Sequence, residues 1–303
     1  MITPFVKLRE ELTKKKLDAI LISSFSNIVY LTNYSGLSKE EREAFLFITK
    51  NSQYILTDGR YTQAVKELIK NFKLIETSSK LPFKDALKNL KTKHKIKKLG
   101  FEGHNISFLE HKELLQRFDN SNHQSLHSLR TIKTSDEISK IEKACELGDK
   151  TFDYILKKIK LGISEKKLAF EIEFFIKSHG ADISFPPIVA FGKNSAVPHH
   201  KTNDQRLTTK DKFILLDFGV RFSNYCSDMT RTIFFGNPST KQKKMYQTVL
   251  EAQKRAIEAL TSDGGPERSR RNSSEVDHIA RDYIISKGYK TIPHSVGHGI
   301  GLE

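Results

Sequence analysis

The chain of 303 residues has only two cysteines, Cys145 and Cys226, and no long apolar run. Two cysteines cannot form a disulfide framework, and such sparse use is typical of a protein kept in a reducing compartment. No segment approaches the ~18 consecutive apolar residues that a membrane-spanning helix needs. The first residues carry charges where a secretory signal needs an apolar segment. We therefore expect a cytoplasmic protein without a membrane association.

Acidic residues are few compared with basic ones: 36 Asp and Glu stand against 51 Lys and Arg, a net charge of +15. Such a charge is compatible with nucleic-acid binding. The densest basic run, Lys91–Lys98, nevertheless has no aromatic residues between its lysines and no nucleic-acid-binding motif around it. We interpret it as a solvated connection between a helix and a strand, and we do not expect a nucleic-acid partner.

Strand-like and helical patterns alternate through the first part of the chain. Apolar runs predict strands at residues 18–23, 44–49, 53–57 and 98–102, and amphipathic spacing predicts helices at residues 5–16, 62–71 and 107–118. Strands interleaved with helices indicate a layered α/β domain. Residues 134–137, Thr-Ser-Asp-Glu, have the form of a capping box that begins a helix. We therefore place a domain boundary near residue 133.

The second part of the chain mixes long helices with a group of strands. Amphipathic spacing predicts helices at residues 138–159, 164–180, 240–260 and 275–287, with strand-like segments from about residue 181 to residue 236. Ser274 and Asp277 are the expected capping pair of the last helix. This order of elements indicates an α+β domain rather than a regular alternation.

Residues 213–236 contain two apolar runs around a polar centre, the pattern of a β-hairpin. Because no Asn-Gly or Gly-X pair occurs there, a four-residue loop is favoured over a two-residue turn. Either loop, centred between Phe222 and Ser223, would place Asp217 opposite Asp228 with their Cβ atoms ~4.5–5.5 Å apart. Facing carboxylates must be neutralised, and two divalent metal ions ~3.5–4 Å apart fit this spacing. The alternative is two exposed acids, each paired with a surface Lys or Arg.

Two further clusters contain histidine. Alternate glycines in residues 293–302 argue against a helix, and as a strand this segment would place His294 and His298 on one face. Two imidazoles on one face suit metal ligation or proton transfer, whereas a lone histidine is more often a satisfied core residue. Residues 190–200 end in adjacent His199 and His200, which cannot both enter one pocket from an extended chain. Taken alone, these two are best interpreted as ordinary loop histidines.

Taken in order, three segments resemble the Xaa-Pro aminopeptidases (aminopeptidase P), prolidases and methionine aminopeptidases, which share the pita-bread fold. They are Gly192–His199, Asp217–Thr232 and His294–Leu302. Asn27–Gly36 and Leu56–Tyr61 are similar to the creatinase/prolidase N-terminal domain. The resemblance covers nearly the whole chain, and its two-domain form favours the Xaa-Pro enzymes over the methionine aminopeptidases.

The resemblance implies an α/β creatinase/prolidase-like N-terminal domain over residues 1–133. An α+β pita-bread (creatinase/aminopeptidase-like) catalytic domain would follow over residues 134–303. It also implies a metal-dependent exopeptidase that hydrolyses the bond before proline in peptides with proline at position two. A homodimer is the expected assembly by the same resemblance.

The family site that the resemblance implies is dinuclear, with two Asp, one His and two Glu ligands. Asp217 would bind one metal, Asp228 would bridge both, and His298 would bind the other. His199 and His294 would hold the substrate and stabilise the tetrahedral intermediate formed by a metal-bound hydroxide. Carboxylate-rich ligation with one imidazole suits Mn, Co, Zn or Fe, and Mn is the commonest metal in the Xaa-Pro branch.

Two departures from the family pattern modify this expectation. The two Glu ligands match no position up to Glu303, so we expect a catalytic domain that is incomplete at the C-terminus and impaired in activity. Gly264–Asn272 is longer and more basic than the connection usual in the family. Prolidase (Xaa-Pro dipeptidase) activity is one alternative function. A non-catalytic pita-bread binding protein is the other.

Overall fold

The computed structural model describes residues 4–39, 41–118, 120–124, 126–261 and 272–303. It divides into two compact units, one containing residues 1–140 with short pieces at 223–225 and 301–303, and the other containing the remainder. No described helix is long and apolar enough to cross a membrane. The loop Gly264–Asn272, apart from its last residue, lies outside the described residues.

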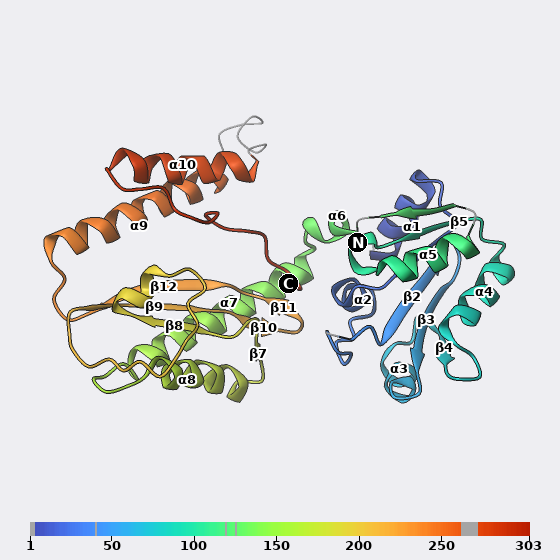
Figure 1. Ribbon diagram of the computed structural model, residues 1–303, viewed down its shortest axis with the longest axis horizontal. Helices are drawn as coiled ribbons and strands as arrows, with labels where there is room; N and C mark the ends of the chain where they lie inside the picture. The colour runs from blue at the N-terminus through green and yellow to red at the C-terminus, as the bar shows by residue number, and fades with distance from the viewer. Residues whose placement is uncertain (1–3, 40, 119, 125, 262–271) are drawn as a thin grey trace. The chain divides into compact units, whose positions relative to one another are not determined.

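A six-stranded mixed sheet forms the centre of the first unit (Figure 1). Its strands are β1 (Ala19–Ile22), β2 (Ala44–Thr49), β3 (Gln53–Asp58), β4 (Lys73–Thr77), β5 (Lys98–Phe101) and β6 (Asn120–His123). The strand order is β4-β3-β2-β1-β5-β6. Strand β2 runs antiparallel to both β1 and β3, whereas β1–β5, β5–β6 and β3–β4 are parallel pairs.

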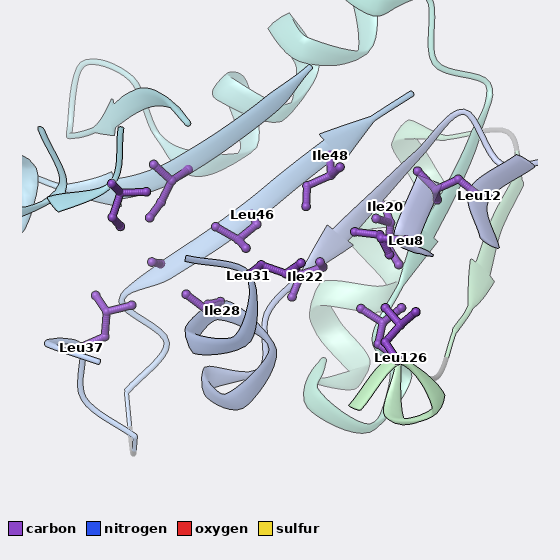
Figure 2. Packing of buried hydrophobic residues seen from close by; sticks show 14 of the residues in the cluster. Leu8, Leu12, Ile20, Ile22, Ile28, Leu31, Leu37, Leu46, Ile48 and Leu126 are labelled. Atoms are coloured by element: carbon purple, nitrogen blue, oxygen red, sulfur yellow. The ribbon is translucent and has the colours of Figure 1, made fainter. Parts of the chain in front are cut away.

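Helices cover both faces of this sheet. They are α1 (Pro4–Lys14), α2 (Phe25–Thr32), α3 (Thr62–Leu68), α4 (Phe83–His94), α5 (Phe108–Arg117) and α6 (His127–Thr131), with a short 3₁₀ turn, η1 (Gly103–Asn105). The alternation of side chains along β1 supplies both cores. Ile20 and Ile22 pack with α1, α2 and α6, as Figure 2 shows, whereas Ala19 and Leu21 pack with α4 and α5.

The layered α/β domain predicted for this region is confirmed, although five of its helices and strands (β4, β6, α2, α4 and α6) were not predicted. Strands β4 and β6 and helices α2 and α6 are too short to show a distinctive period. Helix α4 does show one, with apolar residues at Phe83, Ala86, Leu87 and Leu90, and the prediction overlooked it. The basic run Lys91–Lys98 does connect a helix to a strand, since its first residues end α4 and its last begins β5.

Residues 182–235 form two three-stranded sheets. The strands are β7 (Asp182–Ile183), β8 (Ile188–Phe191), β9 (Lys212–Phe218), β10 (Val220–Phe222), β11 (Tyr225–Cys226) and β12 (Met229–Phe235). Their orders are β12-β9-β8 and β11-β10-β7, and β9 is antiparallel to both of its neighbours. Strand β9 carries Asp217, and Asp228 directly precedes β12.

Four helices accompany these sheets: α7 (Ser135–Leu156), α8 (Glu165–Ser178), α9 (Thr240–Thr261) and α10 (Ser273–Ser286). All four were predicted, with ends shifted by a few residues. Helices α7 and α8 pack on the face of β9 that carries Ile214, Leu216 and Phe218, all fully buried. Helices α9 and α10 pack on each other through a separate cluster that includes Ala252, Ala256 and Ala280, whose small side chains permit close approach.

The hairpin turn differs from its prediction. Ser223 and Asn224 form a two-residue turn with φ of 48° and 73°, and positive φ at both central residues is the type I′ pattern. Asn tolerates this conformation, which a search for Asn-Gly or Gly-X alone overlooks. The turn centre lies one position later than predicted, so Asp217 pairs with Thr230 and not with Asp228.

Two other predictions near the end of the chain are wrong. Residues 293–302 do not form a strand: they run as bends and irregular backbone, with no strand pairing among the described residues. Alternate glycines leave little side-chain surface to stabilise a ladder, and ordering them carries a high entropic cost. The cap of α10 is Asn272, whose side chain accepts a hydrogen bond from the Glu275 amide, and not the pair Ser274 and Asp277.

Candidate active site

Asp217 lies near the end of β9, on the face turned away from the α7–α8 core. Strand alternation sends Leu216 and Phe218 into that core and leaves Asp217 half-buried on the opposite face. The Thr230 hydroxyl, on the paired position of β12, donates a hydrogen bond of 3.1 Å to Asp217 Oδ1. The carboxylate is thus held on a sheet face by its cross-strand neighbour.

Asp228 lies between β11 and β12, two positions before the Asp217 partner Thr230. Because side chains alternate with a period of two, this offset keeps Asp228 on the same face as Asp217 while moving it diagonally along the strand. Burial raises the pKa of Asp217, and repulsion by the Asp228 carboxylate raises it further. The Thr230 hydroxyl and His199 act in the opposite direction.

His199 lies in the loop that follows β8, at a strained position. Its φ is 53°, in the left-handed region, and the amide of His200 donates to the carbonyl of Val197 across a turn. With Pro198 at the second position and positive φ at the third, the turn has the type II pattern, in which the third position normally holds Gly or Asn. A histidine kept in this conformation indicates a constraint imposed from outside the turn.

The two neighbouring histidines have different surroundings, as the sequence predicted. His199 is exposed and interacts electrostatically with Asp217. The ring of His200 turns instead to Glu165, with His200 Nε2 and Glu165 Oε2 2.9 Å apart.

Of the two histidines in the glycine-rich segment, one meets a predicted partner. His298 Nε2 lies 3.2 Å from Asp228 Oδ2, although the imidazole is 67% exposed. The His294 ring hydrogen-bonds to the carbonyl oxygen of Ser295, and no ion pair joins it to an acid among the described residues. The structure therefore brings His298 to Asp228, whereas the hydrogen bond of the His294 ring is to its neighbour Ser295.

Carboxylates and an imidazole are suitable donors for a divalent cation. The described part of the chain nevertheless contains no group of three or more His, Cys, Asp or Glu side chains arranged to hold a metal ion. Asp228 and His298 form a close pair, while Asp217 is fixed by Thr230 instead of completing a triad. The described residues thus form part of a ligand set, in which Asp228 and His298 are already close together.

Comparison with known proteins identifies the family of this chain. Residues 139–303 match Metallopeptidase family M24, and residues 5–134 match the Creatinase/Prolidase N-terminal domain. The chain belongs to metallopeptidase family M24. An uncharacterised peptidase of Staphylococcus saprophyticus is 35% identical over 98% of this chain and 83% of its own length. The uncharacterised peptidase YqhT of Bacillus subtilis is 34% identical over 98% of this chain and 82% of its own length.

Solved structures agree with this assignment. An Xaa-Pro dipeptidase from Bacillus anthracis is similar at 32% identity and a TM-score of 0.86, with 99% of this chain and 82% of that chain covered. An X-Pro aminopeptidase from Thermotoga maritima is similar at 30% identity and a TM-score of 0.85, over the same shares. The predicted fold, a creatinase-type N-terminal domain followed by a pita-bread domain, is therefore confirmed, and membership of M24 implies divalent metal ions.

Two residues of this region had no signal in the sequence. Glu165 follows the predicted start of a helix, and a glutamate there is ordinarily an exposed first-turn acid. In the structure its side chain is fully buried. Thr230 lies in an alternating strand, and only the correct hairpin register identifies it as the partner of Asp217.

Proposed function

We propose that this M24 chain contributes the site of an Xaa-Pro aminopeptidase, which removes the residue before proline from the N-terminus of peptides. Asp217, Asp228 and His298 are the metal ligands that it supplies, and His199 and His294 are the residues that contact substrate. The observation that carries the proposal is the pair formed by Asp228 and His298 on the sheet face that also holds Asp217. Similarity to a solved X-Pro aminopeptidase over 99% of the chain supports it.

Prolidase activity is the second candidate, since an Xaa-Pro dipeptidase and a prolidase from Pyrococcus horikoshii are similar to the same extent. The two activities differ in whether the substrate continues beyond proline. An Xaa-Pro dipeptide and an Xaa-Pro-Xaa tripeptide therefore separate them when assayed side by side. Preferential cleavage of the tripeptide supports the aminopeptidase, and cleavage of the dipeptide alone contradicts it.

Metal binding is the first test. We expect isothermal titration with Mn²⁺ to detect binding to the wild-type chain and at least tenfold weaker binding to Asp228→Asn. This substitution keeps the shape of the side chain but removes the charge beside His298. Asp282→Asn, a change of an acid on α10, is the matched control and should leave Mn²⁺ affinity unchanged. Equal affinities for wild type and Asp228→Asn would contradict the ligand assignment.

Turnover by the 303 residues alone is expected to be low. Two carboxylates and one imidazole cannot balance the charge of two divalent ions, and we assign none of the described residues to accept the proton of an attacking water. General-base assistance is typically worth about 10²–10⁴ in rate. Chelator-sensitive cleavage of an Xaa-Pro substrate at rates typical of enzymes, about 1–10³ s⁻¹, would show that the chain supplies a base and further ligands that we have not identified. The predicted homodimer, manganese preference and cytoplasmic location also stay proposals.

A further inference from the structure

Glu165, at the start of α8, has a fully buried carboxylate that meets four hydrogen-bond partners. Oε1 accepts from the Phe191 amide at 2.8 Å and from Asn194 Nδ2 at 2.9 Å. Oε2 meets His200 Nε2 at 2.9 Å and the Asn203 amide at 3.3 Å. One side chain thus binds the end of β8 and three points of the loop that follows it.

Hydrogen bonds from donors on α8 to acceptors on the loop also hold the loop against the helix. The backbone amides of Glu165 and Lys166, which the first helical turn leaves without intrahelical partners, donate to the carbonyls of Gln205 and Asn203 at 3.0 Å each. The Val189 amide donates to the Thr202 hydroxyl at 2.9 Å. Residues 191–205 are therefore held on both sides of the turn that carries His199, whose own ring is exposed.

This arrangement accounts for the strained conformation of His199. A non-glycine residue at positive φ persists only where its surroundings determine it. Nothing within the turn favours histidine at this position, but its neighbour His200 is fixed by the buried Glu165. The contact between His200 and Glu165 holds the second half of the turn and, with it, the backbone that carries His199.

We propose that Glu165, acting through His200, is a positioning residue that fixes the turn that carries His199. The consequence for substrate binding rests on the proposed function, which assigns His199 to the substrate. The structural part of the proposal, that one buried carboxylate fixes the loop and the His200 ring, does not depend on that assignment.

The test compares the full chain with Glu165→Gln and His200→Ala, and uses Glu173→Gln as the control. Gln keeps the shape of Glu165 but offers only one acceptor oxygen. His200→Ala removes one partner and leaves Glu165 in place, so it carries the test if Glu165→Gln does not fold. Glu173 lies on the same helix and makes only an exposed ion pair with Lys177, so its replacement changes helix charge without touching the loop.

Two readouts report on positioning. We expect amide hydrogen exchange in residues 191–204 to accelerate at least tenfold in Glu165→Gln and His200→Ala, and to stay unchanged in Glu173→Gln. In histidine-labelled protein, the ring resonances of His199 should shift or broaden in both loop variants. Those of His179, at the end of the same helix, should not move. A purely structural role for Glu165 would instead change both histidines and the unfolding midpoint together. Unchanged His199 resonances in Glu165→Gln would overturn the proposal.

Binding of an Ala-Pro dipeptide separates this proposal from the proposed function. If the wild-type chain binds the dipeptide, Glu165→Gln and His199→Ala should weaken binding by similar factors, and the double variant should bind no more weakly than either. Additive losses would overturn the coupling. If the wild-type chain does not bind the dipeptide, the substrate assignment of His199 fails, and the exchange and resonance measurements alone decide whether Glu165 positions the loop.

Discussion

Removal of the Glu102 side chain should be one of the most destabilising single substitutions in the first unit. Glu102 directly follows β5 and is fully buried. Its Oε2 accepts from the backbone amides of Ser23 at 2.6 Å and Ser24 at 2.8 Å, and its Oε1 accepts from the Ser24 hydroxyl and from Asn27 Nδ2. One carboxylate therefore links the ends of two neighbouring parallel strands to the start of α2.

The magnitude follows from which donors lose an acceptor. Glu102→Ala removes the acceptor of two buried donors, the Ser23 amide and Asn27 Nδ2, and each such unsatisfied group costs about 1–3 kcal/mol. We therefore expect a loss of about 4 kcal/mol in the free energy of unfolding. Glu102→Gln should cost only about 1–2 kcal/mol. Its oxygen can still serve both backbone amides, while the Ser24 hydroxyl and the Asn27 amide can reorient to accept from the new NH₂ group.

Glu110→Ala is the matched control. Glu110 also accepts hydrogen bonds at a helix N-terminus, from the amide and hydroxyl of Ser107, but it lies at the surface where water can replace it. Its loss should cost about 1 kcal/mol. Urea denaturation followed by circular dichroism, together with amide exchange at Ser23 and Ser24, measures the three variants. If Glu102→Ala costs no more than Glu110→Ala, buried hydrogen bonding is not what holds these strand ends.

Two further predictions concern the second unit. Hydrogen bonding from the Tyr154 hydroxyl, aided by lysine neighbours, lowers the pKa of Glu171 from 4.5 to about 2. The contribution of ionised Glu171 to the free energy of unfolding should therefore be complete above pH 4.5 and be lost as the pH falls towards 2. Glu171→Gln should remove about 1 kcal/mol of this acid dependence, measured as urea midpoints between pH 5 and pH 2. In Gly219→Ala the added carbon would lie 2.1 Å from the backbone oxygen of Ser227, so a loss of about 1–3 kcal/mol is expected from thermal unfolding. Gly148→Ala, whose added carbon meets nothing nearer than 3.8 Å, should not destabilise the chain.

Most of the fold could be predicted because its long elements carry a clear period. Helices α7 and α9 repeat apolar residues over 22 positions each, and strands such as β2 are continuous apolar runs. Short elements such as α2 lack enough turns to show a period, and α2 is instead held at its start by a distant acid, Glu102. Contacts of that kind join residues far apart in the sequence, and no local sequence pattern predicts them.

The candidate site was predictable in its residue types but less so in its geometry. The sequence identified both aspartates and His298 because acids within apolar strands and paired histidines are unusual. It could not place His294, since the glycine-rich segment has no strand partner among the described residues, and its path depends on contacts with α10, such as the bond from the Val296 amide to Asp277. Nor could it find Glu165, whose role depends on a loop that returns to the helix start about 30 residues later.

The hairpin shows why both aspartates lie on one face of the sheet although the predicted turn was wrong. The observed turn moves the register by two positions, from a pairing of Asp217 with Asp228 to a pairing of Asp217 with Thr230. A slip of one position would have sent the two carboxylates to opposite faces of the sheet. A shift of two keeps them on one face but replaces direct opposition by a diagonal relation, for which spacings of ~7–8 Å are usual. That spacing lets the Thr230 hydroxyl occupy the place opposite Asp217, while Asp228 is free to meet His298. The parity of the strand, rather than the exact turn, is therefore what brings the two acids to the same side of the protein.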